Sequence, residues 1–290
     1  MTHELTRTLQ SIWRFPVKGF AGETLECCAL LANACLPGDR EYAITTGSPI
    51  THKKLGTGWM NKRHFIQLCA ASGVAGWQLL PDEGHEQLIL LHYGIEIMRA
   101  PANAATPLME ALYERQPEIF LGQPRLYRLS GEAYTDTPAP WISLGGSASL
   151  TDFRALTSTP PDNRRFRLNL VLETETPFEE LDWAGRIITI GSVTLKIIEP
   201  VGRCAAISVD PDTATSDTDL LGMMRTHYNH SDLGMFARVT TPGTSGVATA
   251  ISSQNKPSKR LSGDSFRRVF VFWPFSWLRS GSHLARWLFA

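Results

Sequence analysis

The sequence has no net charge, no long hydrophobic run and no cysteine pair of the kind that holds a metal. Its 28 Lys and Arg residues balance its 28 Asp and Glu residues, and no apolar run reaches the roughly 18 residues of a membrane helix. The five cysteines include no Cys-x-x-Cys pair, which argues against a zinc ribbon or a thioredoxin-type site. The N-terminus lacks the continuous apolar stretch of a secretory signal, so we expect a reduced, cytoplasmic protein.

The usual enzyme signatures are missing too. The sequence contains no Walker loop, no nucleophile-elbow serine and no His-Glu-x-x-His. The aspartates of residues 210–219 lack the turning glycine and the closing glutamate of an EF-hand, which indicates a solvated loop. What remains is a chain with 43% hydrophobic residues, enough to bury a core and to exclude a disordered protein.

The charge balance conceals two regions of opposite sign. Residues 252–290 contain seven Lys and Arg against one Asp, a net charge of +6, so residues 1–251 carry −6. An acidic body argues against a nucleic-acid partner, which needs a basic face to neutralise phosphates. The tail from residue 266 has eight aromatic side chains, four arginines and no acid. This composition suggests a peripheral membrane or protein contact, and an extension without any partner is the alternative.

Short runs rich in β-branched and aromatic residues dominate, with Gly and Pro between them. We therefore expect a mainly β protein (β-barrel-rich α+β) with two subdomains. The expected parts are an N-terminal β-barrel-like domain over 1–100, a helical connector over 101–124, a second β-barrel domain over 125–251 and a tail over 252–290. The expected helices cover 107–116, 147–156 and 219–229, and the clearest strands cover 165–173, 186–190 and 193–199.

Cys204 is the cysteine whose neighbours suggest chemistry. It follows a long predicted strand and the turn-forming Pro200 and Gly202, and Arg203 beside it favours the thiolate. Taken singly, the other four cysteines are expected to be small buried hydrophobic residues. Position alone leaves a structural and a functional role for Cys204 equally open.

An ordered set of short motifs resembles the MOSC domain, named for the C-terminal domain of molybdenum-cofactor sulfurases. The matching segments are 165–169, 178–183, 203–204 and 209–211. Upstream, residues 13–19, 38–42 and 134–137 resemble the N-terminal β-barrel domain and a further stretch of the two-domain family. The resemblance covers about residues 8–245. Within that family, the motifs resemble those of the bacterial hydroxylaminopurine-detoxifying proteins and of the mitochondrial amidoxime-reducing component.

The resemblance implies a set of site residues. In that family the cysteine that matches Cys204 ligates the molybdenum of a pterin-dithiolene cofactor, and a soft thiolate suits this metal. Basic residues that match Lys18 and Arg40 bind the cofactor's phosphate, as suits an anion. The remaining expected cofactor contacts are Asp136, Thr137, Arg167, Asn169 and Arg203. Arg165 and Glu180 are left out of the site, because they could equally form a structural ion pair.

The implied activity is that of a molybdenum-dependent oxidoreductase that reduces small N-hydroxylated compounds to amines. No cysteine follows Cys204, so no iron–sulfur cluster can be ligated downstream. The electrons must then come from a separate reductase or ferredoxin. The lack of an electron-transfer motif keeps two alternatives open: a cofactor carrier or sulfur-transfer module, and a barrel protein whose Cys204 is structural.

The chain departs from the family pattern at several places. Leu168 stands where proline is common, and Gly19 stands where the family often has a hydroxyl for the phosphate. The segment 51–54 follows the family's basic segment only loosely. The closing strand is not evident after Gly243, and residues 263–264 are a candidate for its displaced Gly-Asp turn.

Overall fold

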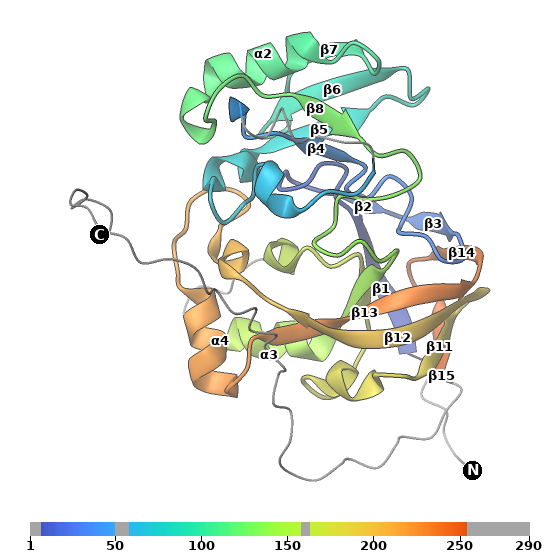
Figure 1. Cartoon of the computed structure of the whole chain (residues 1–290). Coiled ribbons are helices and arrows are strands. Elements are labelled where there is room, and N and C mark those ends of the chain that lie inside the picture. The colour runs from blue at the N-terminus through green and yellow to red at the C-terminus, as the bar shows by residue number, and fades with distance from the viewer. Residues whose placement is uncertain (1–6, 50–57, 158–162, 254–290) are drawn as a thin grey trace, which may run out of the picture. The chain divides into compact units, whose positions relative to one another are not determined.

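The computed structural model describes residues 7–49, 58–157 and 163–253 (Figure 1). These ranges contain fifteen β-strands, three α-helices and six short 3-10 helices. The mainly β class expected from the sequence is confirmed. The predicted tail lies outside the described residues, apart from its first two positions.

Seven strands close into a barrel in the order β10–β9–β13–β12–β11–β15–β1, and β1 pairs back onto β10. The β9–β10 pair is parallel and the other six pairs are antiparallel. The strand bounds are β1 Arg7–Arg14, β9 Ile142–Gly146, β10 Leu170–Leu172, β11 Ile187–Ile190, β12 Val193–Gly202, β13 Asp232–Thr241 and β15 Ala250–Ser253. A short strand, β2 (Glu23–Leu25), pairs with β1 in addition.

The barrel core follows from the alternation of side chains along its strands. On β12, Val193, Leu195 and Ile197 are fully buried while Lys196 between them is exposed. Each such apolar side chain contributes roughly 1.5–3 kcal/mol when it leaves water. The alternation ends near Pro200, where the pairing of β12 with β13 becomes irregular. The segment that carries Cys204 therefore leaves the barrel wall at this point.

The first strand of the chain belongs to the barrel. The boundary at residue 100 predicted from the sequence places β1 in the N-terminal domain, whereas its hydrogen bonds run to β10 and β15. The closing strand that the sequence left unassigned is β15, which lies between β1 and β11. The alternative Gly-Asp turn at residues 263–264 lies outside the described residues.

The N-terminal strands form small separate sheets around a second core and no closed ring of their own in the described residues. One sheet has three antiparallel strands, and α2 packs against its edge strand β7. The bounds are β5 Trp77–Pro81, β6 Gln87–His92, β7 Ile95–Pro101 and α2 Thr106–Arg115. The pair of β4 (Tyr42–Ile44) with β8 (Leu126–Arg128) completes this part. The pair of β3 (Cys27–Leu30) with β14 (Gly243–Gly246) instead packs on the barrel core through Leu30.

Helices α3 (Ser147–Ala155) and α4 (Leu220–Tyr228) lie close to their expected ranges and share a third apolar cluster. The strand expected over 165–173 is wrong in its first half. A 3-10 helix, η4, occupies Asn163–Phe166, and the left-handed backbone of Arg167 (φ 49°) separates it from β10. An extended strand cannot pass through that conformation. The other 3-10 helices are η1 Lys62–His64, η2 Ser72–Gly76, η3 Pro117–Ile119, η5 Glu179–Trp183 and η6 Ala205–Ser208.

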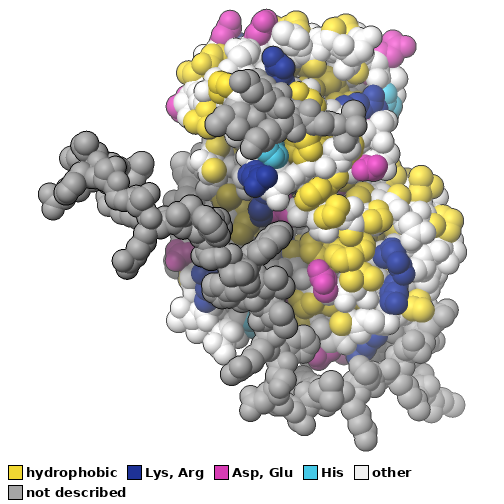
Figure 2. Space-filling view, viewed as in Figure 1, with side chains coloured by type: hydrophobic (Ala, Val, Ile, Leu, Met, Phe, Trp, Pro, Cys, Tyr) yellow, Lys and Arg dark blue, Asp and Glu magenta, His cyan; other side chains and the backbone are white. Residues whose placement is uncertain are grey.

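The described surface gives two plain observations. On the face shown in Figure 2, most Lys and Arg side chains stand apart among hydrophobic and uncharged ones. Among the described residues, no helix is long and apolar enough to cross a membrane.

Candidate functional site

A cavity of about 190 Å³ brings together seven of the eight residues predicted for the site. They come from segments far apart in the sequence, on both the N-terminal part and the barrel: Lys18, Arg40, Asp136, Arg167, Asn169, Arg203 and Cys204. Thr137 is the exception, because its oxygens serve a local turn. Its carbonyl accepts a hydrogen bond from Thr135 Oγ1 (2.6 Å), and its hydroxyl accepts one from the Ala139 N–H (3.2 Å).

Asp136 holds two lysines at the cavity. Lys18 Nζ donates to Asp136 Oδ1 (2.6 Å) and to the Tyr134 carbonyl (3.0 Å), and Lys62 Nζ donates to Asp136 Oδ2 (2.9 Å). Burial alone would raise the pKa of Asp136, but the two ammonium groups outweigh it and lower this pKa to about 2. The Lys18 side chain is only 11% exposed, and this burial lowers its pKa despite the carboxylate beside it.

Arg40 is fixed by both its backbone and its side chain. Its N–H donates to the Phe15 carbonyl (2.7 Å), and its guanidinium pairs with the buried carboxylate of Asp39. A second arm of the guanidinium donates to the Arg167 carbonyl (3.0 Å). The loops that carry residues 40 and 167 are thereby tied together at the cavity.

Arg167 has no ion-pair partner among the described residues. Its guanidinium lies over the Phe15 ring, 4.2 Å from the centroid, and Nη1 donates to the Phe20 carbonyl (2.6 Å). Its Nη2 is shut off from solvent and has no hydrogen-bond partner. Burial, and then the neighbouring Arg40, lower the pKa of Arg167 to about 9. An anion bound near this group would relieve that penalty.

Arg203 and Asn169 are committed to the protein itself. Arg203 donates to the carbonyls of Leu233 (Nε, 2.9 Å) and Phe166 (Nη1, 2.7 Å). Asn169 is 2% exposed, and its amide bonds Ser143 and the Trp13 carbonyl (3.2 Å). Both side chains line the cavity, but their hydrogen bonds hold its walls in place.

Cys204 presents a free, exposed thiol at this cavity. It lies two residues beyond β12 and directly before η6, and its side chain makes no capping hydrogen bond to that helix. The preceding turn is held by the Arg203 N–H, which donates to the Ser231 carbonyl (2.7 Å). Within the described ranges, no group of three or more His, Cys, Asp and Glu side chains is placed to hold a metal ion.

Two further residues of the cavity escaped the sequence analysis. Lys62 lies on η1, and Cys69 lies in a turn with an exposed thiol, so its expected place as a buried residue is wrong. Partial burial, followed by the charge of Cys204, raises the pKa of Cys69. No motif pointed to either residue; the basic segment expected at residues 51–54 lies outside the described residues.

The family model described as the MOSC domain matches residues 139–252. Residues 139–252 form a MOSC domain. This match contains Arg167, Asn169, Arg203 and Cys204. Strand β1 and the predicted site residues Lys18, Arg40 and Asp136 lie before it.

Curated relatives match the chain over a short stretch. A molybdenum cofactor sulfurase of Danio rerio is 44% identical over 52 residues, which is 18% of this chain and 6% of the relative. Molybdenum cofactor sulfurase 3 of Aedes aegypti is 40% identical over 57 residues, which is 20% of this chain and 7% of the relative. The chain thus matches less than a tenth of the length of either relative.

Solved structures with some similarity share little sequence. The YuaD protein from Bacillus subtilis has a TM-score of 0.44 at 12% identity, over 85% of this chain and 94% of that chain. YiiM from Escherichia coli has a TM-score of 0.32 at 14% identity, over 40% of this chain and 55% of that chain.

Proposed function

We propose that the chain binds a molybdenum–pterin cofactor in this cavity, with Cys204 as the protein's ligand to the metal. The observation that carries the proposal is an exposed, unbonded thiol in a cavity with surplus positive charge. A thiolate is a soft ligand of the kind that such a metal accepts, and lysine and arginine suit a phosphate. The MOSC domain and the names of the two sulfurase relatives support this choice.

The cavity residues fit an anionic cofactor. Arg167 Nη2 lacks a partner, and Arg40 lies close enough to disfavour the charge of Arg167. We therefore assign Lys18, Arg40 and Arg167 to the cofactor's negatively charged groups. Because Asn169 and Arg203 already bond the backbone, we assign them a positioning role on the walls.

We further infer that the loaded protein reduces N-hydroxylated compounds, in the balance R–NHOH + 2H⁺ + 2e⁻ → R–NH₂ + H₂O. When bound, the cofactor supplies the two-electron redox centre for this reaction. The chain contributes a fixed cation, since the hydrogen bond from Lys62 to Asp136 raises the lysine's pKa and keeps it charged beside Cys204. A separate reductase or ferredoxin supplies the electrons.

Metal and pterin analysis of the full chain from a molybdenum-replete host tests the cofactor. We expect about one molybdenum per chain, as for a single tightly held group, and loss of the metal in Cys204→Ser. Cys27→Ser is the matched control, since Cys27 is also exposed but lies outside the cavity. Wild-type protein without molybdenum, or Cys204→Ser with full metal content, contradicts the proposal.

The reductase activity needs its own test. We expect the loaded chain to convert 6-hydroxylaminopurine to adenine with a reduced viologen as electron donor. A loaded chain that gives no adenine refutes the reductase and leaves the cofactor site standing.

The second thiol favours one other candidate, a sulfur-transfer module. Cys69 and Cys204 line the same cavity, and both thiols are exposed. Such a module would carry a terminal sulfur atom on Cys204 as a persulfide, R–S–SH. Intact-mass analysis of protein purified under anaerobic conditions would show the gain of one sulfur atom, absent in Cys204→Ser.

A further inference from the structure

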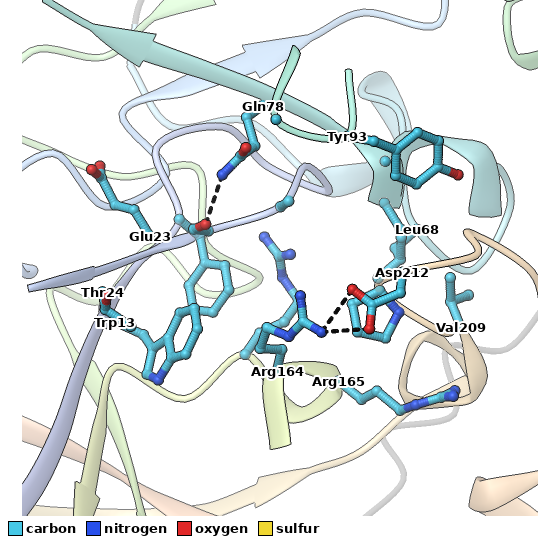
Figure 3. A pocket seen from close by; sticks show the side chains of 18 residues that line it. Trp13, Glu23, Thr24, Leu68, Gln78, Tyr93, Arg164, Arg165, Val209 and Asp212 are labelled. Atoms are coloured by element: carbon cyan, nitrogen blue, oxygen red, sulfur yellow. Dashed lines mark hydrogen bonds and ion pairs between the residues drawn. The ribbon is translucent and has the colours of Figure 1, made fainter. Parts of the chain in front are cut away.

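A second cavity, of about 520 Å³, lies beside the first and shares Leu68, Arg165 and Arg167 with it (Figure 3). Neither Cys204 nor Lys18 lines this larger cavity. Its volume falls in the range of roughly 300–1,000 Å³ that small-molecule sites occupy. It is therefore a second candidate binding site, and Arg167 is the one residue assigned to the cofactor that it includes.

Aromatic rings form its walls. Trp13 and Tyr93 stand on opposite sides of the view in Figure 3, and Phe15 also lines the cavity. Two of these rings lie in close contact with glycines. A Cβ at Gly22 would lie 2.5 Å from the Phe15 ring, and one at Gly76 would lie 2.6 Å from the Tyr93 ring. Any larger residue at these two positions would displace a ring from the wall.

Tyr93 occupies a position that suits other residues better. It forms the two-residue turn between β6 and β7 with Gly94, and both have positive φ values, 48° and 76°. Asn and Gly favour such turns and aromatic residues do not. The half-exposed Tyr93 ring, 50% accessible, is thus held at the cavity at a conformational cost.

Of the charged side chains that line the cavity, all but one arginine have an ion-pair partner among the described residues. Asp212 pairs with Arg164 (2.8 Å), and Glu23 pairs with Arg14 (2.9 Å). Arg165 is held by carboxylates outside the cavity. No carboxylate in the described part of the chain lies within ion-pair distance of Arg167, whose guanidinium rests on Phe15. A ligand here would meet aromatic faces and one positive charge.

We propose that this cavity binds a planar aromatic molecule that carries a negatively charged group. The ring system stacks on Tyr93, and the anionic group faces Arg167. The cavity includes neither the thiol nor the lysines of the first site, but it shares Arg167 with that site, so the binding tests below use the chain without cofactor.

Calorimetric titration of the full chain with 2-naphthoate tests this site. Two matched probes separate its features: 2-naphthamide keeps the rings without the charge, and cyclohexanecarboxylate keeps the charge without the aromatic rings. We expect 2-naphthoate to bind at about 1 mM or below and each of the other probes to bind at least about fivefold more weakly.

Three variants locate the ligand. Tyr93→Asn removes the ring yet suits the left-handed turn, and we expect it to weaken 2-naphthoate binding about fivefold or more. Ile95→Asn is the control, because Ile95 is 69% exposed near the same turn and lies outside the cavity. Lys18→Met alters only the first cavity, so binding should persist. Absence of binding, equal binding by Tyr93→Asn, or loss of binding in Lys18→Met overturns the proposal.

Discussion

Arg165 and Arg167 lie two positions apart on the same segment and line the same cavities, but the partners of their guanidinium groups differ. The Arg165 side chain is 3% exposed, and its terminal nitrogens bond Asp210 (2.5 Å), Asp217 (2.9 and 3.0 Å) and the Ser208 carbonyl (2.9 Å). Arg167 bonds one backbone carbonyl and has no carboxylate partner within the ranges that the structure describes. The fold neutralises the first cation, and we propose that a ligand neutralises the second.

The largest effect expected from this comparison is on stability. Arg165→Met leaves the carboxylates of Asp210 and Asp217 without their counter-charge, so we expect a loss of about 3 kcal/mol in unfolding free energy. Urea denaturation measures it. Arg99→Met is the control, since its ion pair with Glu96 is exposed and its removal should leave the unfolding free energy nearly unchanged. Similar losses for both variants would undo the distinction between a buried and a surface cation.

Arg167→Met should act on ligand binding more than on stability. Removal of an uncompensated buried charge offsets the lost hydrogen bond, so the unfolding free energy should change by less than about 1 kcal/mol. Loss of a charge-assisted contact should lower cofactor affinity about tenfold. Molybdenum retained after extensive dialysis measures it. Full retention, or a stability loss equal to that of Arg165→Met, would place both arginines in the same role.

The ion pairs of Asp136 predict how the unfolding free energy depends on pH. Its folded-state pKa of about 2 lies below the usual 3.8, so its contribution is present above pH 3.8 and is lost as the pH falls through about 2. Because the side chain is 53% exposed, we expect about 1 kcal/mol at most. Unfolding free energies of wild type and Asp136→Asn should differ at pH 6 and converge toward pH 2. A difference that is constant over this range would rule out the two lysines as the cause.

The smallest expected effect is the difference in stability loss between variants of the two lysines that bond Asp136. Lys62 is 43% exposed, so Lys62→Met should cost less than about 0.5 kcal/mol, whereas Lys18→Met should cost about 1 kcal/mol. Thermal unfolding of both variants under identical conditions compares them. A larger loss for Lys62→Met would mean that the exposed lysine, and not the buried one, holds Asp136.

The motifs that resemble the MOSC family predicted eight site residues, and the structure brings seven of them to one cavity. Arg40 and Arg167 both have left-handed backbones, at φ 49°, and both were placed in the site by short motifs. Their chemistry within the site stays a prediction. Side-chain partners were harder to see: Arg165 pairs with Asp210 and Asp217, and Glu180 instead accepts a hydrogen bond from Ser149 (2.7 Å). Partners that lie more than 40 positions away leave no periodic trace in a sequence.

Residues on irregular segments could not be found by periodicity. Lys62 lies on a three-residue 3-10 helix and Cys69 lies in a turn, where neither strand nor helix patterns apply. The place of β1 was equally hidden, since an alternating run does not reveal which sheet it joins. The expected helices succeeded because α3 and α4 each bury one face.

The position of β1 between β10 and β15 sets an order of events during synthesis. The strand at residues 7–14 pairs locally with β2, but its pairs with β10 and β15 must wait until residues 170–172 and then 250–253 have left the ribosome. Such long-range pairing makes folding slow and leaves strand edges open to other chains in the meantime. A fragment restricted to residues 139–252 would lack β1 altogether and keep an open seam in its barrel.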